Sequence, residues 1–297
     1  MKVLLVHNPD AGTAGETTGG LVAALTAGGH QVEDILLEGD RWQAALDTPA
    51  DVIVAAGGDG TARTVAIALA TSPHVRTPLA ILAQGTANNI ARSLGMPEEP
   101  GELARGLAGA DRSRLTIGCV RAPFGVAHFV ESAGVGVFAT MLRSSRHIRQ
   151  RRSRDERIAA GIEHLRKLLE DANPVEVAVT ADGEDYSGCW LMAQAMNIIA
   201  AGSRVELAPG ADPADTALDL VLIGERDREL VLDYLARLAR GEDVESPLAS
   251  RRCRRITMGW PQGAGHIDDH AWPESDVPRG TEVGIEVATA IPVLVPR

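Results

Sequence analysis

The sequence is poor in aromatic residues and in cysteine. Phe, Trp and Tyr make up 3% of the 297 residues, so a core must be built from Ala, Val, Leu and Ile, and nucleic-acid binding by base stacking is disfavoured. The three cysteines, Cys119, Cys189 and Cys253, lie far apart and outside any CxxC spacing. This spacing indicates neither a disulfide framework nor a zinc site and is typical of a protein of the reducing cytoplasm.

Long hydrophobic runs and net positive charge are also lacking. No segment approaches the roughly 18 apolar residues of a membrane span, so we expect any membrane contact to be peripheral, at the inner membrane face. The formal net charge is -11, and an acidic chain is not expected to bind nucleic acid. With 45% hydrophobic residues the chain can still bury a substantial core, and its length fits two domains.

The first third of the chain alternates short apolar runs with stretches of helical spacing. Runs that are apolar on both faces are typical of strands in a buried, mostly parallel sheet. Gly, Asn and Thr follow these runs, which is the order of a strand, a turn and a helix. The predicted strands cover residues 3–6, 32–37, 52–56 and 79–83, and the predicted helices cover residues 21–26 and 62–70.

From about residue 115 the pattern changes to alternating strands separated by turn residues. Residues 175–180 precede an Asp-Gly turn and residues 218–223 precede a glycine, which predicts antiparallel strands. One helix is expected among them, at residues 158–169, where apolar side chains recur on one face.

These patterns predict an α/β fold with two domains. The first is a parallel-sheet, nucleotide-binding domain over residues 1–118. The second is a β-rich, antiparallel, sandwich-like domain over residues 119–283. The C-terminal residues 284–297 are again strand-like. They could form a strand of either domain, and a strand in the first domain is favoured.

Three turns rich in Gly, Asn and Thr follow predicted strands, at residues 8–15, 57–61 and 85–89. In a parallel sheet the ligand lies beyond the carboxyl ends of the strands. Glycines let the backbone approach phosphate oxygens, and the N–H groups at a helix start add positive potential. One such turn is equally well explained as a simple connection, but three together predict a phosphate-binding site.

The turn at residues 57–61 differs from the common phosphate motifs. It has no Walker A lysine, and Arg63 stands where the dinucleotide fingerprint needs a small residue. Thr61 and Thr86 can add hydroxyl donors. Asp59 would repel phosphates unless it binds a cation, a hydroxyl or a sugar, so its presence points to a function.

Residues 134–139 match the pattern GxGxxA. The acid expected about 20 residues further on would be Asp155, which lies in an arginine-rich stretch and not at a strand end. Tight packing of the glycines is therefore favoured over a dinucleotide site, which remains open as the alternative.

The order of the motifs resembles the diacylglycerol kinase catalytic-domain family, which includes bacterial lipid kinases and sphingosine kinases. The markers are Asn8-Pro9, the turn at residues 57–61 (GGDGT), and residues 85–95 (GTANNIARSLG). The resemblance implies an ATP-binding α/β domain, a β-rich domain and an active site in the cleft between them. It implies transfer of the ATP γ-phosphate to the hydroxyl of a diacylglycerol-like lipid. The residues implied in ATP binding are Asn8, Gly57, Gly58, Asp59, Gly60, Thr61, Gly85 and Thr86, with Asn88 close by.

Residues 209–219 (PGADPADTALD) resemble the family's segment that holds Mg²⁺. The resemblance assigns the carboxylate ligand to Asp215, with Asp212 and Ala217 as backbone ligands, and such oxygen donors suit this ion. Thr216 stands where the family has glycine. The alternative is a polar loop between two strands.

Residues 266–270 (HIDDH) resemble the family's Asp-Gly-Glu segment. Asp268 is the matching general base, which would take the proton of the acceptor hydroxyl, and with Asp59 it is one of two catalytic candidates. Asp269 replaces the family's glycine and His270 replaces its glutamate, which indicates either a divergent specificity or a weakened activity. Apart from the family, the two His and two Asp residues leave a transition-metal site open beside a solvated loop.

A dense basic segment lies within residues 143–157 of this acidic chain. Such a segment could dock the protein on an anionic membrane surface, and the alternative is a solvated helix face. Residues 251–255 (RRCRR) could add to it. The seven arginines of the segment are Arg143, Arg146, Arg149, Arg151, Arg152, Arg154 and Arg157.

Two other functions compete with a lipid kinase. NAD kinases share the Gly-Gly-Asp-Gly turn, but they carry an Asn-Glu pair that this sequence lacks. A nucleotide- or lipid-binding regulator without catalysis is the second alternative, because His270 replaces a family glutamate. The expected partners are a lipid substrate and ATP with Mg²⁺. The acceptor lipid is not determined by the sequence, and a homodimer remains open.

Overall fold

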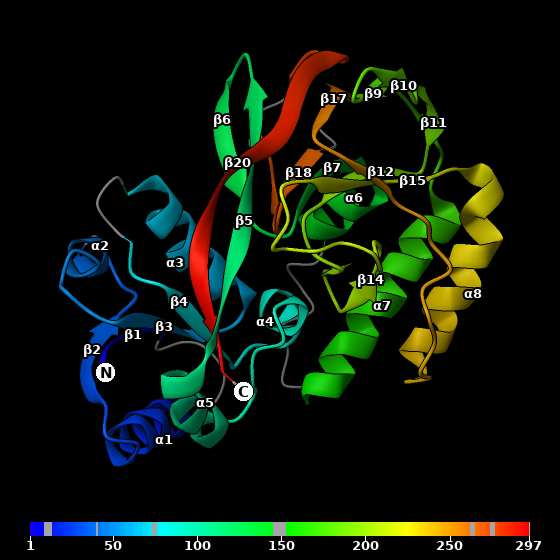
Figure 1. The fold of residues 1–297 in the computed structure, drawn as a ribbon. Helices are drawn as coiled ribbons and strands as arrows, with labels where there is room; N and C mark the ends of the chain where they lie inside the picture. The colour runs from blue at the N-terminus through cyan, green and yellow to red at the C-terminus, as the bar shows by residue number, and fades with distance from the viewer. Residues whose placement is uncertain are drawn as a thin grey trace. The chain divides into compact units, whose positions relative to one another are not determined.

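A computed structural model describes residues 1–8, 14–39, 41–72, 76–144, 153–261, 265–273 and 277–296. The chain forms two compact units (Figure 1). Unit 1 comprises Met1–Ile117, Pro213–Asp215 and Thr289–Arg297, and unit 2 comprises Gly118–Asp212 and Thr216–Ala288. No helix within the described ranges is long and apolar enough to cross a membrane.

Unit 1 is built on a parallel sheet whose strands lie in the order β4-β3-β1-β2. The last strand of the chain, β20 (Thr281–Val295), adds to it by pairing in parallel with β4 through Val293 and Leu79. The four N-terminal strands are β1 (Lys2–His7), β2 (Gln31–Leu36), β3 (Val52–Gly57) and β4 (Leu79–Ala83). The helices of unit 1 are α1 (Ala14–Ala27), α2 (Arg41–Ala45), α3 (Asp59–Thr71), α4 (Asn89–Ser93) and α5 (Pro100–Gly106), with a 3₁₀ turn at Leu107–Gly109.

The central strands of unit 1 are buried on both faces, as the sequence predicts, whereas the edge strand β2 is partly exposed. Every residue of β3 and β4 is buried, which explains why both strands are apolar without alternation. On one face Val54 and Leu82 pack with Leu25 of α1 and Leu103 of α5. Strand β4 coincides with its prediction. Helix α3 begins earlier than predicted, because its first turn uses the polar residues of the glycine-rich loop.

Unit 2 contains two antiparallel sheets packed face to face, which confirms the predicted β-rich sandwich. One sheet has six strands in the order β16-β15-β12-β7-β18-β19. The other is the antiparallel part of a ten-stranded sheet, formed by β10, β9, β17 and β20 with β5 and β6 alongside, and β20 connects it to β4 of the parallel strands. The strands of the first sheet are β7 (Ser132–Gly136), β12 (Met192–Met196), β15 (Leu218–Ile223), β16 (Arg251–Cys253), β18 (Gly265–Ile267) and β19 (His270–Ala271). Those of the second are β5 (Asp111–Ala122), which starts in unit 1, β6 (Gly125–Phe129), β9 (Val179–Ala181), β10 (Glu184–Asp185) and β17 (Arg255–Trp260).

The core between these sheets is made by their inward-facing residues. Phe129 and Trp260, both fully buried, are its largest side chains, and Ala193 and Leu220 of the six-stranded sheet pack in the same cluster. Short strands complete the unit: β8 (Val175–Val177) with β11 (Gly188–Trp190), and β13 (Ala200–Ala201) with β14 (Val205–Glu206).

Three helices of unit 2 pack on the outer face of the six-stranded sheet (Figure 1). They are α6 (Val137–Ser144), α7 (Arg154–Asp171) and α8 (Arg228–Ala239). The prediction of a single helix was therefore wrong, although the predicted residues 158–169 lie within α7. Helix α8 escaped prediction because it presents Leu230 to solvent while Val231, Tyr234 and Leu235 face the sheet, so its apolar residues do not form one clean stripe.

A second correction concerns residues 175–180, which do not form one strand. The chain changes partners at Ala178: β8 pairs with β11, whereas β9 pairs with β17 and β10. An alternating pattern predicts extended backbone, but it does not identify the neighbouring strand.

The glycines of the GxGxxA segment serve packing. A Cβ placed on Gly134 would lie 2.3 Å from the carbonyl oxygen of Ala193, and one on Gly136 would lie 2.2 Å from that of Leu191. Gly136 also has a φ of +96°. Because these strands are antiparallel, the segment is not the start of a parallel dinucleotide-binding unit, and the packing interpretation is confirmed.

Gly134→Ala is expected to lower the free energy of unfolding by about 1–3 kcal/mol, because the added methyl group collides with a backbone oxygen in a packed sheet. Gly284→Ala is the matched control in β20, where nothing lies within 4 Å of an added Cβ, and it should change stability by less than about 0.5 kcal/mol. Urea unfolding of both variants measures the difference. Equal stabilities would contradict the packing role of Gly134.

Candidate functional site

The loops after β1, β3 and β4 leave the sheet of unit 1 side by side at its carboxyl edge. His7 pairs with Ala56, and Gly57 pairs with Ala83. The strands therefore end at the same level, and the predicted ligand-binding turns are brought together. Asn8, the first residue after β1, is half-buried. Pro9 and the rest of that turn through residue 13 lie outside the described residues.

The loops after β3 and β4 touch through two glycines. A Cβ on Gly85 would lie 2.4 Å from the Cα of Gly58, and one on Gly58 would lie 3.1 Å from the Cα of Gly85. The amide of Gln84 also donates to the carbonyl of Gly57 at 2.8 Å. A methyl group on Gly85 would collide with the Gly58 backbone, and one on Gly58 would be in tight contact with Gly85. One contact thus accounts for a glycine in each of the two motifs.

Gly57 and Thr61 form a second close contact within the first of these loops. A Cβ on Gly57 would lie 2.4 Å from Oγ1 of Thr61, whose side chain is 4% exposed. The Thr61 hydroxyl therefore packs against the loop backbone. Thr86, in the neighbouring loop, is half-buried.

Asn88 shapes the loop after β4. It adopts the left-handed conformation with φ 57° and is 1% exposed. Its Oδ1 accepts the amide of Gly85 at 2.7 Å, and its Nδ2 donates to the carbonyl of Gly85 at 3.2 Å. Asparagine tolerates this backbone conformation better than most residues, so Asn88 closes the turn that holds Gly85 in place.

Asp59 links the two loops electrostatically. Its Oδ1 accepts the backbone N–H of Ile90 at 2.9 Å, in the first turn of α4. A carboxylate at a helix N-terminus satisfies an N–H donor and interacts favourably with the helix dipole. The structure thus gives Asp59 a supporting role between the loops, and the catalytic role implied by the resemblance stays a prediction.

The N-terminus of α3 offers donors to an anion. The helix starts at Asp59, with Gly58 as its N-cap and no side-chain cap, and the N–H groups of a first turn have no intrahelical acceptor. Nothing lies within 4 Å of a Cβ placed on Gly60. Nε2 of Gln84 is buried and has no hydrogen-bond partner within the described part of the chain. This set of donors around open space fits phosphate oxygens.

The predicted magnesium loop is fastened to β5 within unit 1. Thr116 donates its amide to the carbonyl of Pro213 at 2.7 Å and its hydroxyl to the carbonyl of Asp215. Asp215 is half-buried, and Asp212, which belongs to unit 2, is exposed. The carboxylate and carbonyl groups of this loop offer oxygen atoms as metal ligands, which is the kind that Mg²⁺ prefers.

Asp268 lies in unit 2, 3% exposed, in the turn after β18. Its carboxylate accepts three consecutive backbone N–H groups: Val130 at 3.1 and 3.2 Å, Glu131 at 2.7 Å and Ser132 at 3.1 Å. Its own amide donates to the carbonyl of Ser132 at 2.7 Å. These bonds anchor the connection between β6 and β7, and the general-base role stays a prediction.

Asn197 holds the same connection from the other side. Its Nδ2 donates to the carbonyl of Val130 at 2.8 Å, and its amide donates to the carbonyl of Glu131 at 2.9 Å. Glu131 and Asn197 are 6% and 2% exposed. Sequence reasoning missed both residues. The available signal was a polar residue at the end of an apolar strand pattern, where burial requires a hydrogen-bond partner.

His266 supports the Asp268 turn through a buried network. The three residues Gln194, Gly134 and His266 lie in one row across β12, β7 and β18. Because Gly134 has no side chain, Nε2 of His266 reaches Oε1 of Gln194 at 2.6 Å, and Nδ1 lies 3.0 Å from the carbonyl oxygen of Asp268. Burial lowers the pKa of His266 to about 4, against the opposing effect of the Asp268 carbonyl. The ring is therefore neutral at pH 7.

Asp269 and His270 lie on the surface, where Nδ1 of His270 is 2.6 Å from Oδ1 of Asp269. The structure separates this exposed pair from the buried His266 and Asp268. Among the described residues, no group of three or more His, Cys, Asp or Glu is placed to hold a metal ion.

The basic segment at residues 143–157 is described only at its ends. Arg143 is exposed in the last turn of α6, and Arg154 and Arg157 are half-buried in α7. Arg146, Arg149, Arg151 and Arg152 lie outside the described residues. Docking of this segment on a membrane remains a prediction.

Two family models match the chain. The model described as "Diacylglycerol kinase catalytic domain" matches residues 2–120, and the model described as "YegS C-terminal NAD kinase beta sandwich-like domain" matches residues 132–270. Together they account for most of the chain and place its halves in the order that the motifs predict.

Curated relatives agree with these matches. The chain is 26% identical over 223 residues to "Probable lipid kinase YegS-like" of Stenotrophomonas maltophilia, covering 73% of this chain and 71% of the relative. It is 24% identical over 308 residues to "Diacylglycerol kinase" of Mycobacterium tuberculosis, covering 100% of this chain and 96% of the relative.

Solved structures share the fold. A diacylglycerol kinase from Bacillus anthracis superposes with a TM-score of 0.70 at 20% identity, over 98% of this chain and 96% of that one. Yeast NADH kinase superposes with a TM-score of 0.52 at 13% identity, over 100% of this chain and 84% of that one. At these identities the likeness concerns the fold alone.

Gly85→Ala is expected to lower the free energy of unfolding by about 1–3 kcal/mol, because its methyl group would overlap the Gly58 backbone. Gly60→Ala is the control from the same site. It adds a methyl group in open space at a helix start and should leave stability unchanged or raised by less than about 1 kcal/mol. Urea unfolding measures both variants. A Gly85→Ala protein as stable as Gly60→Ala would contradict the required contact.

The free energy of unfolding is expected to decrease as the pH falls, because of His266. Its pKa is about 4 in the folded protein and about 6.5 unfolded, so between these values the unfolded state binds more protons. The neutral His266 therefore contributes up to about 3 kcal/mol to the free energy of unfolding. This contribution is complete above pH 6.5 and is lost as the pH falls toward 4. Urea unfolding at pH 7.5, 5.5 and 4.5 should show a shallower loss for His266→Asn than for the wild type. His164→Asn in α7, whose ring is not among the groups that act on His266, is the control, and the difference in slope should be specific to His266→Asn. A wild-type slope in His266→Asn would contradict the prediction.

Proposed function

Because the chain belongs to the diacylglycerol kinase catalytic-domain family, we propose that it is an ATP-dependent lipid kinase. The reaction transfers the γ-phosphoryl group of Mg²⁺-bound ATP to the hydroxyl of a diacylglycerol-like lipid. The identities to named relatives are low, so the acceptor and the activity are part of this proposal.

The observation that carries the proposal is the cradle at the carboxyl edge of unit 1. The Gly58–Gly85 contact holds two loops together, and the uncapped first turn of α3 presents N–H donors beside the open space at Gly60. Phosphoryl transfer depends mainly on positioning and charge stabilisation. A rigid set of backbone donors supplies both for a triphosphate.

The proposed roles of individual residues follow from this geometry. Asn8, Gly57, Gly58, Gly60, Gly85 and Thr86 would lie along the triphosphate. Asp59 and Asn88 fix the loops through Ile90 and Gly85, so they act on the phosphates through the backbone. Asp212 and Asp215 would supply oxygen ligands to the Mg²⁺ that accompanies ATP.

Asp268 is proposed as the group that receives the acceptor proton. Its carboxylate already accepts the N–H groups of residues 130–132, so the same residue would also fix this segment. The two roles predict different defects. If Asp268 acts only as a base, its replacement lowers kcat and leaves the free energy of unfolding unchanged. If it also holds residues 130–132, its replacement lowers both.

A second candidate function is nucleotide binding without catalysis. It is favoured by the engagement of the Asp268 carboxylate with backbone donors and by the surface pair of Asp269 and His270, since His270 occupies the position of a family glutamate. NAD phosphorylation ranks below both, because the likeness to an NADH kinase concerns the fold alone.

The cradle is tested by Gly60→Ala, whose added methyl group would occupy the proposed phosphate space. We expect ATP affinity to fall at least tenfold, which corresponds to about 1.4 kcal/mol, while the unfolding free energy is preserved. Gly109→Ala, in a surface turn of unit 1 where nothing lies within 4 Å of an added Cβ, should bind ATP like the wild type. Calorimetric titration measures the affinity, and unchanged binding by Gly60→Ala would place the nucleotide elsewhere.

The transfer reaction is tested with radiolabelled ATP and a panel of diacylglycerol, sphingoid base and phosphatidylglycerol. The wild type should phosphorylate at least one lipid, and Asp268→Asn should lose at least 100-fold in kcat. A thermal melt of Asp268→Asn separates a base from an anchor. ATP binding without transfer to any lipid would favour the regulator, and the absence of both would exclude a kinase.

A further inference from the structure

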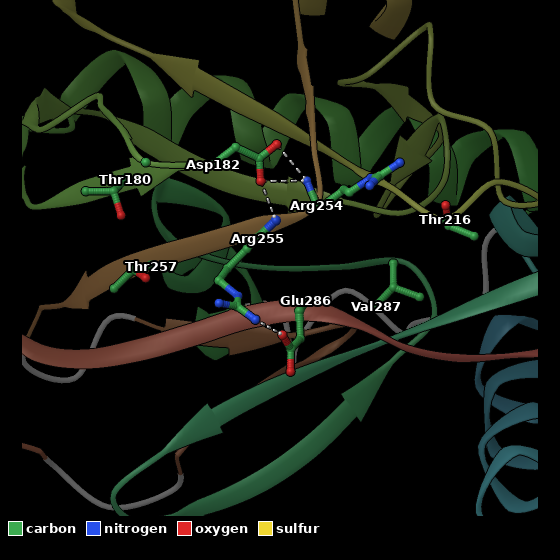
Figure 2. Close-up of a pocket in the computed structure, with 9 residues that line it drawn as sticks. Thr180, Asp182, Thr216, Arg254, Arg255, Thr257, Glu286 and Val287 are labelled. Carbon is green, nitrogen blue, oxygen red and sulfur yellow. Dashed lines mark hydrogen bonds and ion pairs between the residues drawn. The ribbon is translucent and has the colours of Figure 1, made fainter.

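A hollow lies on the outer face of the second sheet of unit 2, with a volume of about 950 Å³ (Figure 2). We call it the threonine–arginine pocket; its lining includes Thr180, Thr216, Thr257, Arg254, Arg255 and Glu286. On β17, Thr257 and Arg255 alternate with Ile256 and Met258, which belong to the core. The pocket is therefore built by the side of the sheet that faces away from the core.

Two hydroxyls lie next to each other at one end of the pocket. Thr257 pairs with Thr180 on β9 and with Gly284 on β20. Both threonines project from the same face, and no side chain at Gly284 covers that row. Thr216 contributes a third hydroxyl from the loop before β15, at the other end of the pocket, and the side chain of Arg254 points toward it (Figure 2). Hydroxyl groups can donate to an anion as readily as they accept from a cation, so the charges decide the ligand.

The pocket is lined by two guanidinium groups, of Arg254 and Arg255, and by two carboxylates, of Asp182 and Glu286, and Arg121 beside Glu286 adds a third cation. Glu286 lies between two guanidinium groups, with Arg121 at 3.1 Å and Arg255 at 3.5 Å. One carboxylate thus faces two cations. This local excess stands against the formal net charge of -11 of the whole chain.

Arg254 adds a further cation. The nearby carboxylate of Asp182 accepts the backbone N–H groups of Arg254 and Arg255 at 2.9 to 3.1 Å (Figure 2). Asp182 is therefore engaged by the main chain. Among the residues that the structure describes, the exposed guanidinium of Arg254 has no ion pair or hydrogen bond.

We propose that the threonine–arginine pocket binds a phosphate ester group. Arg254 would take two phosphate oxygens in a bidentate arrangement, and the hydroxyl of Thr216 would donate to a third. The hydroxyls of Thr180 and Thr257 lie at the opposite end of the pocket (Figure 2). A phosphate ester offers more acceptor oxygens than a carboxylate and so matches this set of donors better. All lining residues of the pocket belong to unit 2, whereas the ATP cradle is made of residues of unit 1, and the proposal does not depend on kinase activity.

Two sources can present this group: a soluble phosphate ester and the headgroup of an anionic phospholipid. The probes are glycerol 3-phosphate, titrated calorimetrically, and phosphatidylcholine vesicles with and without phosphatidic acid, used in co-sedimentation. The variants are Arg254→Ala, which removes the unpaired guanidinium, and Thr216→Val, which keeps the shape of a β-branched side chain and removes only the hydroxyl. Arg226→Ala, an exposed arginine outside the pocket, is the matched control, and thermal melts verify folding.

We expect the wild type and Arg226→Ala to bind one of the two probes equally. Arg254→Ala should weaken that binding at least tenfold, and Thr216→Val at least threefold. If Arg254→Ala loses affinity only for glycerol 3-phosphate, the pocket binds a soluble ester. If it loses affinity only for phosphatidic acid vesicles, the pocket binds a lipid headgroup. The proposal is overturned if Arg254→Ala binds both probes as Arg226→Ala does, or if neither probe binds the wild type.

Discussion

The contact between Gly58 and Gly85 is the constraint on which the candidate site depends. The two Cα atoms approach so closely that a methyl group on either residue meets the other backbone. This contact holds the loops after β3 and β4 at one level, where Asn88 and Asp59 then fix their shape. A phosphate cradle made of backbone donors needs this kind of rigidity, since its donors cannot be reoriented one by one.

Unit 2 uses buried polar groups for the same purpose. Asp268 collects the N–H groups of residues 130–132, and His266 and Gln194 meet across Gly134 beside it. The Asp268 carboxylate and both ring nitrogens of His266 have partners within about 3 Å, because an unpaired polar group would be costly there. The family's proposed base thus belongs to a network whose first effect is structural. This arrangement ties any chemistry at Asp268 to the integrity of the sheet ends.

Much of the fold follows from local patterns. Strands β3 and β4 were predicted because a strand buried on both faces must be apolar at every position. Helix α7 was predicted because one of its faces is apolar. Local patterns gave wrong predictions where the structure of a segment depends on the strand or sheet that it packs against. Residues 175–180 read as one strand but join two different sheets, and α8 carries apolar residues on its exposed face as well.

The sequence by itself determined the glycine-rich turns, the order of a parallel and an antiparallel domain, and the family to which these motifs belong. Only the tertiary structure decided how those residues are used. It showed that Asn88 and Asp59 brace loops, that Asp268 anchors residues 130–132, and that Glu131 and Asn197 gather beside it. The physical reason is that turns and strands are set by neighbours in the chain, whereas a hydrogen-bond partner or a bare glycine contact is set by residues brought together from distant positions.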